Sequence, residues 1–103
     1  MLKKTLIYEI VDLYSAREFL KSYTDPVIIT NKEGSTRYYG MLVLDYMFKN
    51  LIAEFPQITK IIVNVSDDNA ALFTAIKLNY THINYNGKSE TARKMIRKSL
   101  RAK

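Results

Sequence analysis

The chain has 103 residues, the common size of one folded domain, so we expect a single domain over residues 1–103. Its 48% hydrophobic and 25% charged residues, with only 3 glycines and 2 prolines, exclude a disordered or fibrous chain. The lack of cysteine excludes disulfides, thiolate metal sites and a cysteine nucleophile, and it suits a reducing cytoplasm.

The formal net charge of +6 comes from the C-terminal segment. Residues 88–103 hold seven Lys or Arg and one Glu, and the rest of the chain is neutral. No segment approaches the roughly 18 uninterrupted apolar residues of a membrane span. We therefore expect a cytoplasmic protein without a membrane span.

The first half of the chain predicts strand, helix and strand. Residues 5–11, "TLIYEIV", are apolar and β-branched with one acidic interruption, which favours a strand. Ser15 as N-cap, with Glu18 three residues later, predicts a short helix that ends at Asp25-Pro26. Residues 26–30, "PVIIT", show no alternation and no charge, so they predict a strand buried on both faces.

A polar stretch, "TNKEGSTRYYG" at residues 30–40, precedes the longest predicted helix, residues 38–55. Residues 60–65, "KIIVNV", predict another buried strand. Ser66 or Asp67 is then expected to cap a helix over residues 69–79, with Asn79 in the left-handed position at its end.

The last part of the chain predicts a strand over residues 81–85, a turn at Asn86-Gly87 and a basic helix to about Arg101. Four strand-helix units predict an α/β domain: a mainly parallel four-stranded sheet with helices on both faces, flavodoxin-like (order 2-1-3-4) or STAS-like. The first strand could instead run antiparallel at an edge. Pairing of the edge strand 81–85 with a second copy would give a homodimer.

Ligands of open α/β sheets bind beyond the carboxyl ends of the strands, near the point where strand order reverses. The loop residues expected there as a ligand site are Ser35, Thr36, Arg37, Asp67 and Asp68. The first loop combines a turn at a helix start with an arginine, which suits a phosphate or another anion. It matches neither the Walker A nor the dinucleotide fingerprint, because its glycines stand six apart.

A purely structural interpretation of the same loop remains open. Gly34 would form the turn, and Ser35 or Thr36 would cap the helix. Tyr38 and Tyr39 would pack, and Gly40 would allow close contact between helix and sheet.

Asp67-Asp68 could meet Asp12 if the first and third strands are neighbours, and three carboxylates suit Mg²⁺. The alternative is ordinary capping of helix N-termini by aspartate. His82 is the only histidine and has no identifiable nucleophile or orienting acid. We therefore expect no metal centre, no cofactor and no catalytic residue.

The last helix is strongly amphipathic. Its apolar stripe holds Ala92, Met95, Ile96 and Leu100, and its basic surface consists of Arg93, Lys94, Arg97, Lys98 and Arg101. Such a surface could dock on nucleic acid or an acidic protein. It could equally be the solvated side of a helix that covers the sheet.

Short motifs between about Asp12 and Ile96 resemble a family of small uncharacterised bacterial proteins, chiefly alphaproteobacterial. The motifs are Pro26-Val27, Tyr39-Gly40, Phe55-Pro56, and Asp67-Asp68 followed by Ala71, Ala75 and Leu78. The family pattern has glycine where this chain has Ser66, Ala70 and Asn79. The resemblance implies an α/β fold of four strand-helix units and no particular reaction.

No catalytic triad, metal cluster or complete phosphate loop can be assembled from the sequence. The leading hypothesis is a non-catalytic binding or regulatory module that acts through its surface, most simply as a homodimer. The alternatives are a small-molecule or anion site at the two loops, with or without enzymatic activity, and binding of an acidic partner or nucleic acid by the last helix.

Overall fold

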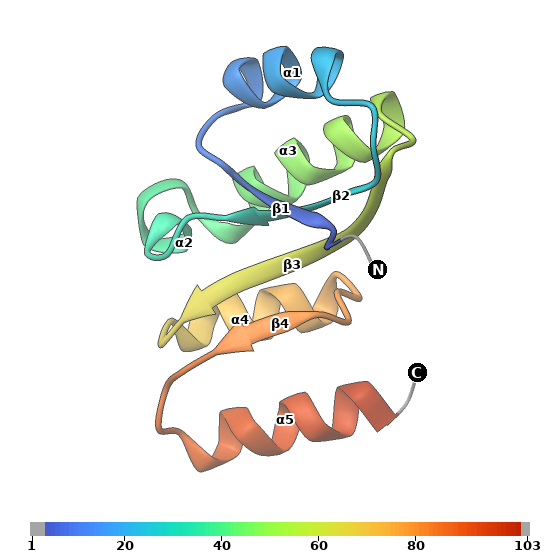
Figure 1. The fold of residues 1–103 in the computed structure, drawn as a ribbon. Helices are drawn as coiled ribbons and strands as arrows, with labels where there is room; N and C mark the ends of the chain where they lie inside the picture. The colour runs from blue at the N-terminus through green and yellow to red at the C-terminus, as the bar shows by residue number, and fades with distance from the viewer. Residues whose placement is uncertain (1–3, 102–103) are drawn as a thin grey trace.

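Strands and helices alternate along the chain, as Figure 1 shows for this computed structural model. The structure describes the backbone of residues 4–101 and the side chains of residues 4–98. The elements are β1 (Leu6–Ile10), α1 (Leu13–Ser22), β2 (Val27–Asn31), α2 (Ser35–Tyr39), α3 (Met41–Glu54), β3 (Ile58–Ser66), α4 (Asn69–Lys77), β4 (Ile83–Tyr85) and α5 (Glu90–Arg101). The predicted α/β class is confirmed.

The four strands form one parallel sheet in the order β1-β2-β3-β4. The predicted order 2-1-3-4 is wrong, and so is the alternative of an antiparallel first strand. Each strand pairs with the strand that precedes it in the chain, so the order never reverses. Right-handed crossovers that all run in one direction place every connecting helix on the same face of the sheet.

The helices accordingly form one layer. Helix α1 packs on α3, α3 on α4, and α4 on α5, in the same sequence as the strands. The molecule measures 42 × 34 × 20 Å, and its short dimension fits one sheet plus one helix layer. The prediction of helices on both faces is therefore wrong, and within residues 4–101 no helix lies on the other face of the sheet.

The core lies between the sheet and the helix layer. Alternate residues of β2 are buried, and its other residues are only partly buried. The prediction that β2 is buried on both faces is wrong, because only the side chains of one parity meet helices. Fully buried core side chains are Ile10, Leu20, Val27, Ile29, Leu44, Phe48, Leu51, Val63, Val65 and Leu72.

Two helices begin at aspartates. The Asp12 carboxylate accepts a hydrogen bond from the Ser15 amide at 2.7 Å and so caps α1, a role that the sequence assigned to Ser15. This bond holds the pKa of Asp12 below its ordinary value. Asp68 caps α4 through the Ala71 amide at 3.1 Å, one position later than predicted.

The long helix predicted over residues 38–55 is two helices. Gly40 separates α2 from α3 with φ 86° and ψ 148°, which no helical residue adopts. A Cβ built on Gly40 would meet no atom within 4 Å, so close contact between helix and sheet is not what requires glycine here. Its backbone conformation requires glycine.

Among the described residues, Ser66 (52°) and Asn79 (69°) have positive φ without being glycine. Asn79 follows α4 in the left-handed position that the sequence predicted. Ser66 ends β3. None of the helices between residues 4 and 101 is long and apolar enough to cross a membrane.

Candidate functional site

The five residues predicted as a ligand site lie together, because β2 and β3 are neighbours and their loops leave the same edge of the sheet. The Thr36 hydroxyl donates a hydrogen bond to Asp68 Oδ2 at 3.0 Å. The Arg37 guanidinium meets the Asp67 carboxylate at 2.7 Å. The structure thus joins the two loops through two contacts.

The polar groups of these loops are largely engaged with one another. The Ser35 hydroxyl donates to the Lys32 carbonyl at 2.6 Å and accepts from the Asn31 amide at 2.8 Å. Asp68 combines its cap of α4 with the Thr36 contact. The hydrogen bond from Arg37 lowers the pKa of Asp67, so that carboxylate stays ionised beside its partner. Anion binding by these loops stays a prediction.

Asp12 does not join the two aspartates of the β3 loop. Strand β2 lies between β1 and β3, so the condition for a three-carboxylate site is not met. Among the residues that the structure describes, no three His, Cys, Asp or Glu side chains are placed to hold a metal ion.

The fold also lacks the usual ligand crevice of open α/β sheets. That crevice forms where strand order reverses and neighbouring helices lie on opposite faces. In this sheet the order runs β1-β2-β3-β4 without reversal. This topology therefore has no switch point at which a ligand site would be expected.

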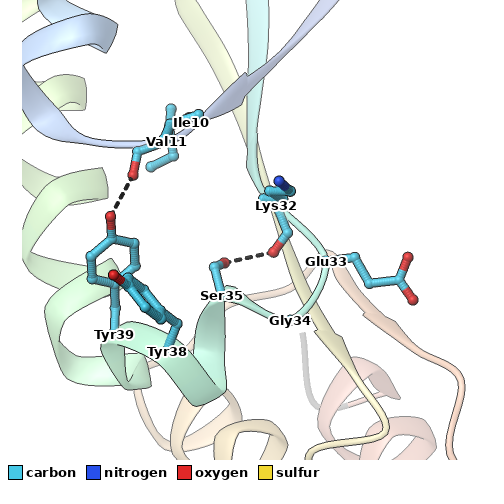
Figure 2. A pocket seen from close by; sticks show the side chains of 8 residues that line it. All are labelled: Ile10, Val11, Lys32, Glu33, Gly34, Ser35, Tyr38 and Tyr39. Carbon is cyan, nitrogen blue, oxygen red and sulfur yellow. Dashed lines mark hydrogen bonds between the residues drawn. The ribbon is translucent and has the colours of Figure 1, made fainter.

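A pocket of about 340 Å³ lies beside the first loop, between it and the end of β1 (Figure 2). Tyr39 points toward β1 and donates its hydroxyl hydrogen to the Val11 carbonyl at 3.1 Å. Tyr38 is 81% exposed and meets the Tyr39 ring edge-on, so of the two tyrosines expected to pack, only Tyr39 packs against the core. The Glu33 side chain extends away from both tyrosines (Figure 2).

Asn31 is a polar core residue that the sequence did not single out beyond its place in the loop. It is fully buried at the end of β2, and its side chain replaces backbone pairing with β3. Its amide nitrogen donates to the Asn64 carbonyl at 2.8 Å, and its oxygen accepts from the Asn64 amide at 2.7 Å. The only signal was an asparagine directly after an uncharged β-branched run.

Asp45 is a second buried polar residue without a clear sequence signal. It lies on α3 and accepts a hydrogen bond from the Tyr80 hydroxyl at 2.6 Å, while Lys49 reaches its other oxygen at 3.1 Å. Burial, and then the bond to Asp45, raises the pKa of Tyr80 above its ordinary value. The arrangement joins α3 to the segment after α4, and it is structural.

The uncovered face of the sheet carries side chains of one parity from three strands. Strand β1 contributes Ile7 and Glu9, which pair in register with Ile28 and Thr30 of β2. Ile28 and Thr30 pair in turn with Lys60 and Ile62 of β3. We call these six residues the open face. Sequence reasoning missed this surface because it assumed helices on both sides of every central strand.

The basic surface of α5 is present where the structure describes it. Arg93, Lys94, Arg97 and Lys98 are exposed, and the side chain of Arg101 lies outside the described residues. Arg93 also donates to the Gly87 carbonyl at 3.0 Å, which ties the start of the helix to the preceding turn. Binding of an acidic protein or nucleic acid by this surface stays a prediction.

Comparison with known proteins finds a relative in an uncharacterised protein of Rickettsia prowazekii (strain Madrid E). The two chains are 52% identical over 91 residues, which is 87% of this chain and 86% of the relative. The chain belongs to this alphaproteobacterial family. No family model matches it, and no solved structure matches it. Membership in the alphaproteobacterial family brings no activity with it, so a function has to be argued from the geometry.

Proposed function

We propose that this protein is a non-catalytic cytoplasmic binding module that docks another protein surface on the open face of its sheet. One observation carries the proposal: the face has no helix on it, although it presents Ile28 and Ile62 on the two central strands. Neither residue is part of the buried core or of the residues packed against it.

Parallel sheets are almost always covered on both faces, because their strands are apolar on both sides. Ile7, at the edge of the open face, is 54% exposed. Burying the apolar area of such side chains stabilises an association by roughly 25 cal/mol per Å². A partner that covers the three isoleucines thus gains on the order of a few kcal/mol before the costs of association.

The competing sites offer less. The Ser35 hydroxyl already donates to the Lys32 carbonyl, the Thr36 hydroxyl to Asp68, and Asp68 also caps α4. The Arg37 charge already has Asp67 as its partner. A ligand at these loops would have to replace internal contacts, whereas a partner on the open face replaces only water.

The proposal can be tested with a single thiol, since the chain has no cysteine. Asn84→Cys places the thiol on β4 beside Asn64, at the rim of the open face, where a thiol-specific photocrosslinker can be attached without covering the isoleucines. Ala53→Cys, exposed on the far side of α3, is the matched control. Each labelled protein is irradiated alone and in an extract of the bacterium that produces the protein.

We expect a discrete crosslinked product from the Asn84→Cys protein in at least one of the two conditions. Adding Ile62→Lys to the labelled chain should abolish this product, because a charge on the face opposes apolar docking. Excess unlabelled wild-type protein should suppress a product formed with a different protein, because it competes for that protein. The Ala53→Cys protein should give no such product. If neither condition yields a product that Ile62→Lys abolishes, the open face does not bind protein and the proposal fails.

A further inference from the structure

The six residues of the open face form two rows across three strands. Ile7, Ile28 and Lys60 make one row, and Glu9, Thr30 and Ile62 make the next. The two charges therefore occupy opposite corners, and Ile7 and Ile62 occupy the other two corners. Neither Glu9 nor Lys60 has an ion-pair partner among the described residues.

We propose that the partner on this face is a second copy of the chain, stacked sheet on sheet about a two-fold axis along the diagonal from Ile7 to Ile62. Glu9 of each copy then lies opposite Lys60 of the partner subunit. The inference rests on the proposed function and adds the identity of the partner.

The register makes this face self-complementary. Neighbouring strands lie about 4.8 Å apart and successive rows about 6.8 Å apart, so Glu9 and Lys60 stand about 12 Å apart in one copy, too far to pair. A two-fold axis that lies between two stacked faces relates positions on one side of the axis in one copy to positions on the opposite side in the other copy. An axis along the isoleucine diagonal brings the acid corner of one copy over the base corner of the other, twice.

The apolar residues fit the same axis. Ile7 and Ile62 lie on the axis and meet their own counterparts, and Ile28 lies next to it. The strands of the two sheets then cross at a steep angle, which is the orthogonal class of sheet packing. The two ion pairs sit at the rim of this contact, where charges set the register of docking more than its strength.

The charge of the face argues against other classes of partner. One acid and one base leave the open face neutral, so it offers no attraction to nucleic acid or to an anionic surface. Edge pairing through β4, the route to a homodimer expected from the sequence, offers a strand of only three residues. The open face is the larger and more specific surface.

Charge reversal tests the arrangement on the full chain. Sedimentation velocity over a concentration series gives the dissociation constant of the dimer for wild type, Glu9→Lys, Lys60→Glu and the double variant. Lys77→Glu, on an exposed position of α4, is the control for net charge. Circular dichroism checks that each variant folds.

We expect wild type to dimerise and each single reversal to weaken the dimer by about tenfold or more, because like charges then face each other. The double variant should recover to within about threefold of wild type, since its pairs are restored with reversed sign. Lys77→Glu should leave the constant unchanged. Equal constants for wild type and both single variants, or a double variant as weak as the singles, would overturn the inference.

A chain that stays monomeric at every concentration also overturns the inference but not the proposed function. The two are separated by the photocrosslinking of the Asn84→Cys protein. A product formed only in extract, and suppressed by wild type, shows that the face binds a different protein. A product of the isolated protein at twice the 12.0 kDa chain mass supports the second copy.

Discussion

At the scale of single residues, Asn31 closes the carboxyl end of the central strand pair. Its side chain makes both a donated and an accepted hydrogen bond with the backbone of Asn64, as a neighbouring strand would. It also donates to the Ser35 hydroxyl, which starts α2. One buried amide thus holds β2, β3 and the first loop together.

Replacing Asn31 by alanine should lower the free energy of unfolding by about 2–4 kcal/mol, because a buried backbone N–H and C=O lose their partners. Urea denaturation followed by circular dichroism measures the change. Asn50→Ala is the control, since that side chain bonds only an exposed carbonyl of its own helix; we expect a change below about 0.5 kcal/mol. A loss for Asn31→Ala no larger than for the control would contradict the role given to Asn31.

The sequence predicted which loop residues meet but not what they do there. The proximity of Arg37 and Asp67 was predictable because both residues follow central strands of a parallel sheet. That they pair with each other, at 2.7 Å, depends on side-chain geometry that no spacing in the sequence encodes. Asn31 was hidden for a related reason, since a strand residue and a loop residue look alike until the register with β3 is known.

At the scale of elements, the break between α2 and α3 depends on one residue. Gly34 and Gly40 both have positive φ, 85° and 86°, but they differ in ψ. Gly34, with ψ −9°, lies near the left-handed helical region that asparagine tolerates. Gly40, with ψ 148°, lies close to a region that is essentially reserved for glycine.

Asparagine substitutions should therefore separate the two glycines. We expect Gly40→Asn to lower the free energy of unfolding by about 1–3 kcal/mol. Gly34→Asn should cost less than about 1 kcal/mol, because asparagine visits the left-handed region readily. Since a Cβ meets no atom within 4 Å at either position, the difference isolates backbone strain. Equal losses, measured by thermal and urea unfolding, would rule out this explanation of the break.

Element types were predictable, whereas their ends were not. Apolar periodicity located every strand and helix of the structure except the α2–α3 break, which the pattern from Tyr38 to Phe55 bridges without interruption. The predicted N-caps of α1 and α4 were wrong because several good capping residues stand near the start of each helix: Asp12, Ser15, Ser66, Asp67 and Asp68. Only the backbone path decides which of them is placed to accept a bond.

At the scale of the whole molecule, the strand order determines which face of the sheet carries helices, and the sequence did not reveal that order. Four parallel strands can adopt the observed order β1-β2-β3-β4 or the predicted order 2-1-3-4 with nearly the same amino-acid composition. Runs such as "VIIT" were interpreted as buried on both sides, because an uncharged β-branched run is what buried parallel strands show. In this fold the same runs leave Ile28 and Thr30 on a face without helices. An apolar run therefore marks either a doubly covered strand or a docking surface.

The order of the strands also favours a binding site on the face of the sheet over one at the loops. A sheet without reversal has all its helices on one side, so it has no crevice between layers and a whole face to offer. The order therefore leaves Ile7, Ile28 and Ile62 without a helix over them, although Ile28 and Ile62 are partly buried by their neighbours in the sheet.

Isoleucine methyl groups report directly on docking through the open face. In a protein with ¹³C-labelled isoleucine methyls, a soluble paramagnetic reagent broadens the resonances of methyls that solvent reaches. Ile28 and Ile62 should be broadened in dilute protein and protected as the concentration rises, whereas Ile29 stays protected and Ile52, 44% exposed on α3, stays broadened throughout. If the Ile28 and Ile62 resonances remain broadened at every concentration and also in bacterial extract, nothing covers the open face and it is not a docking surface.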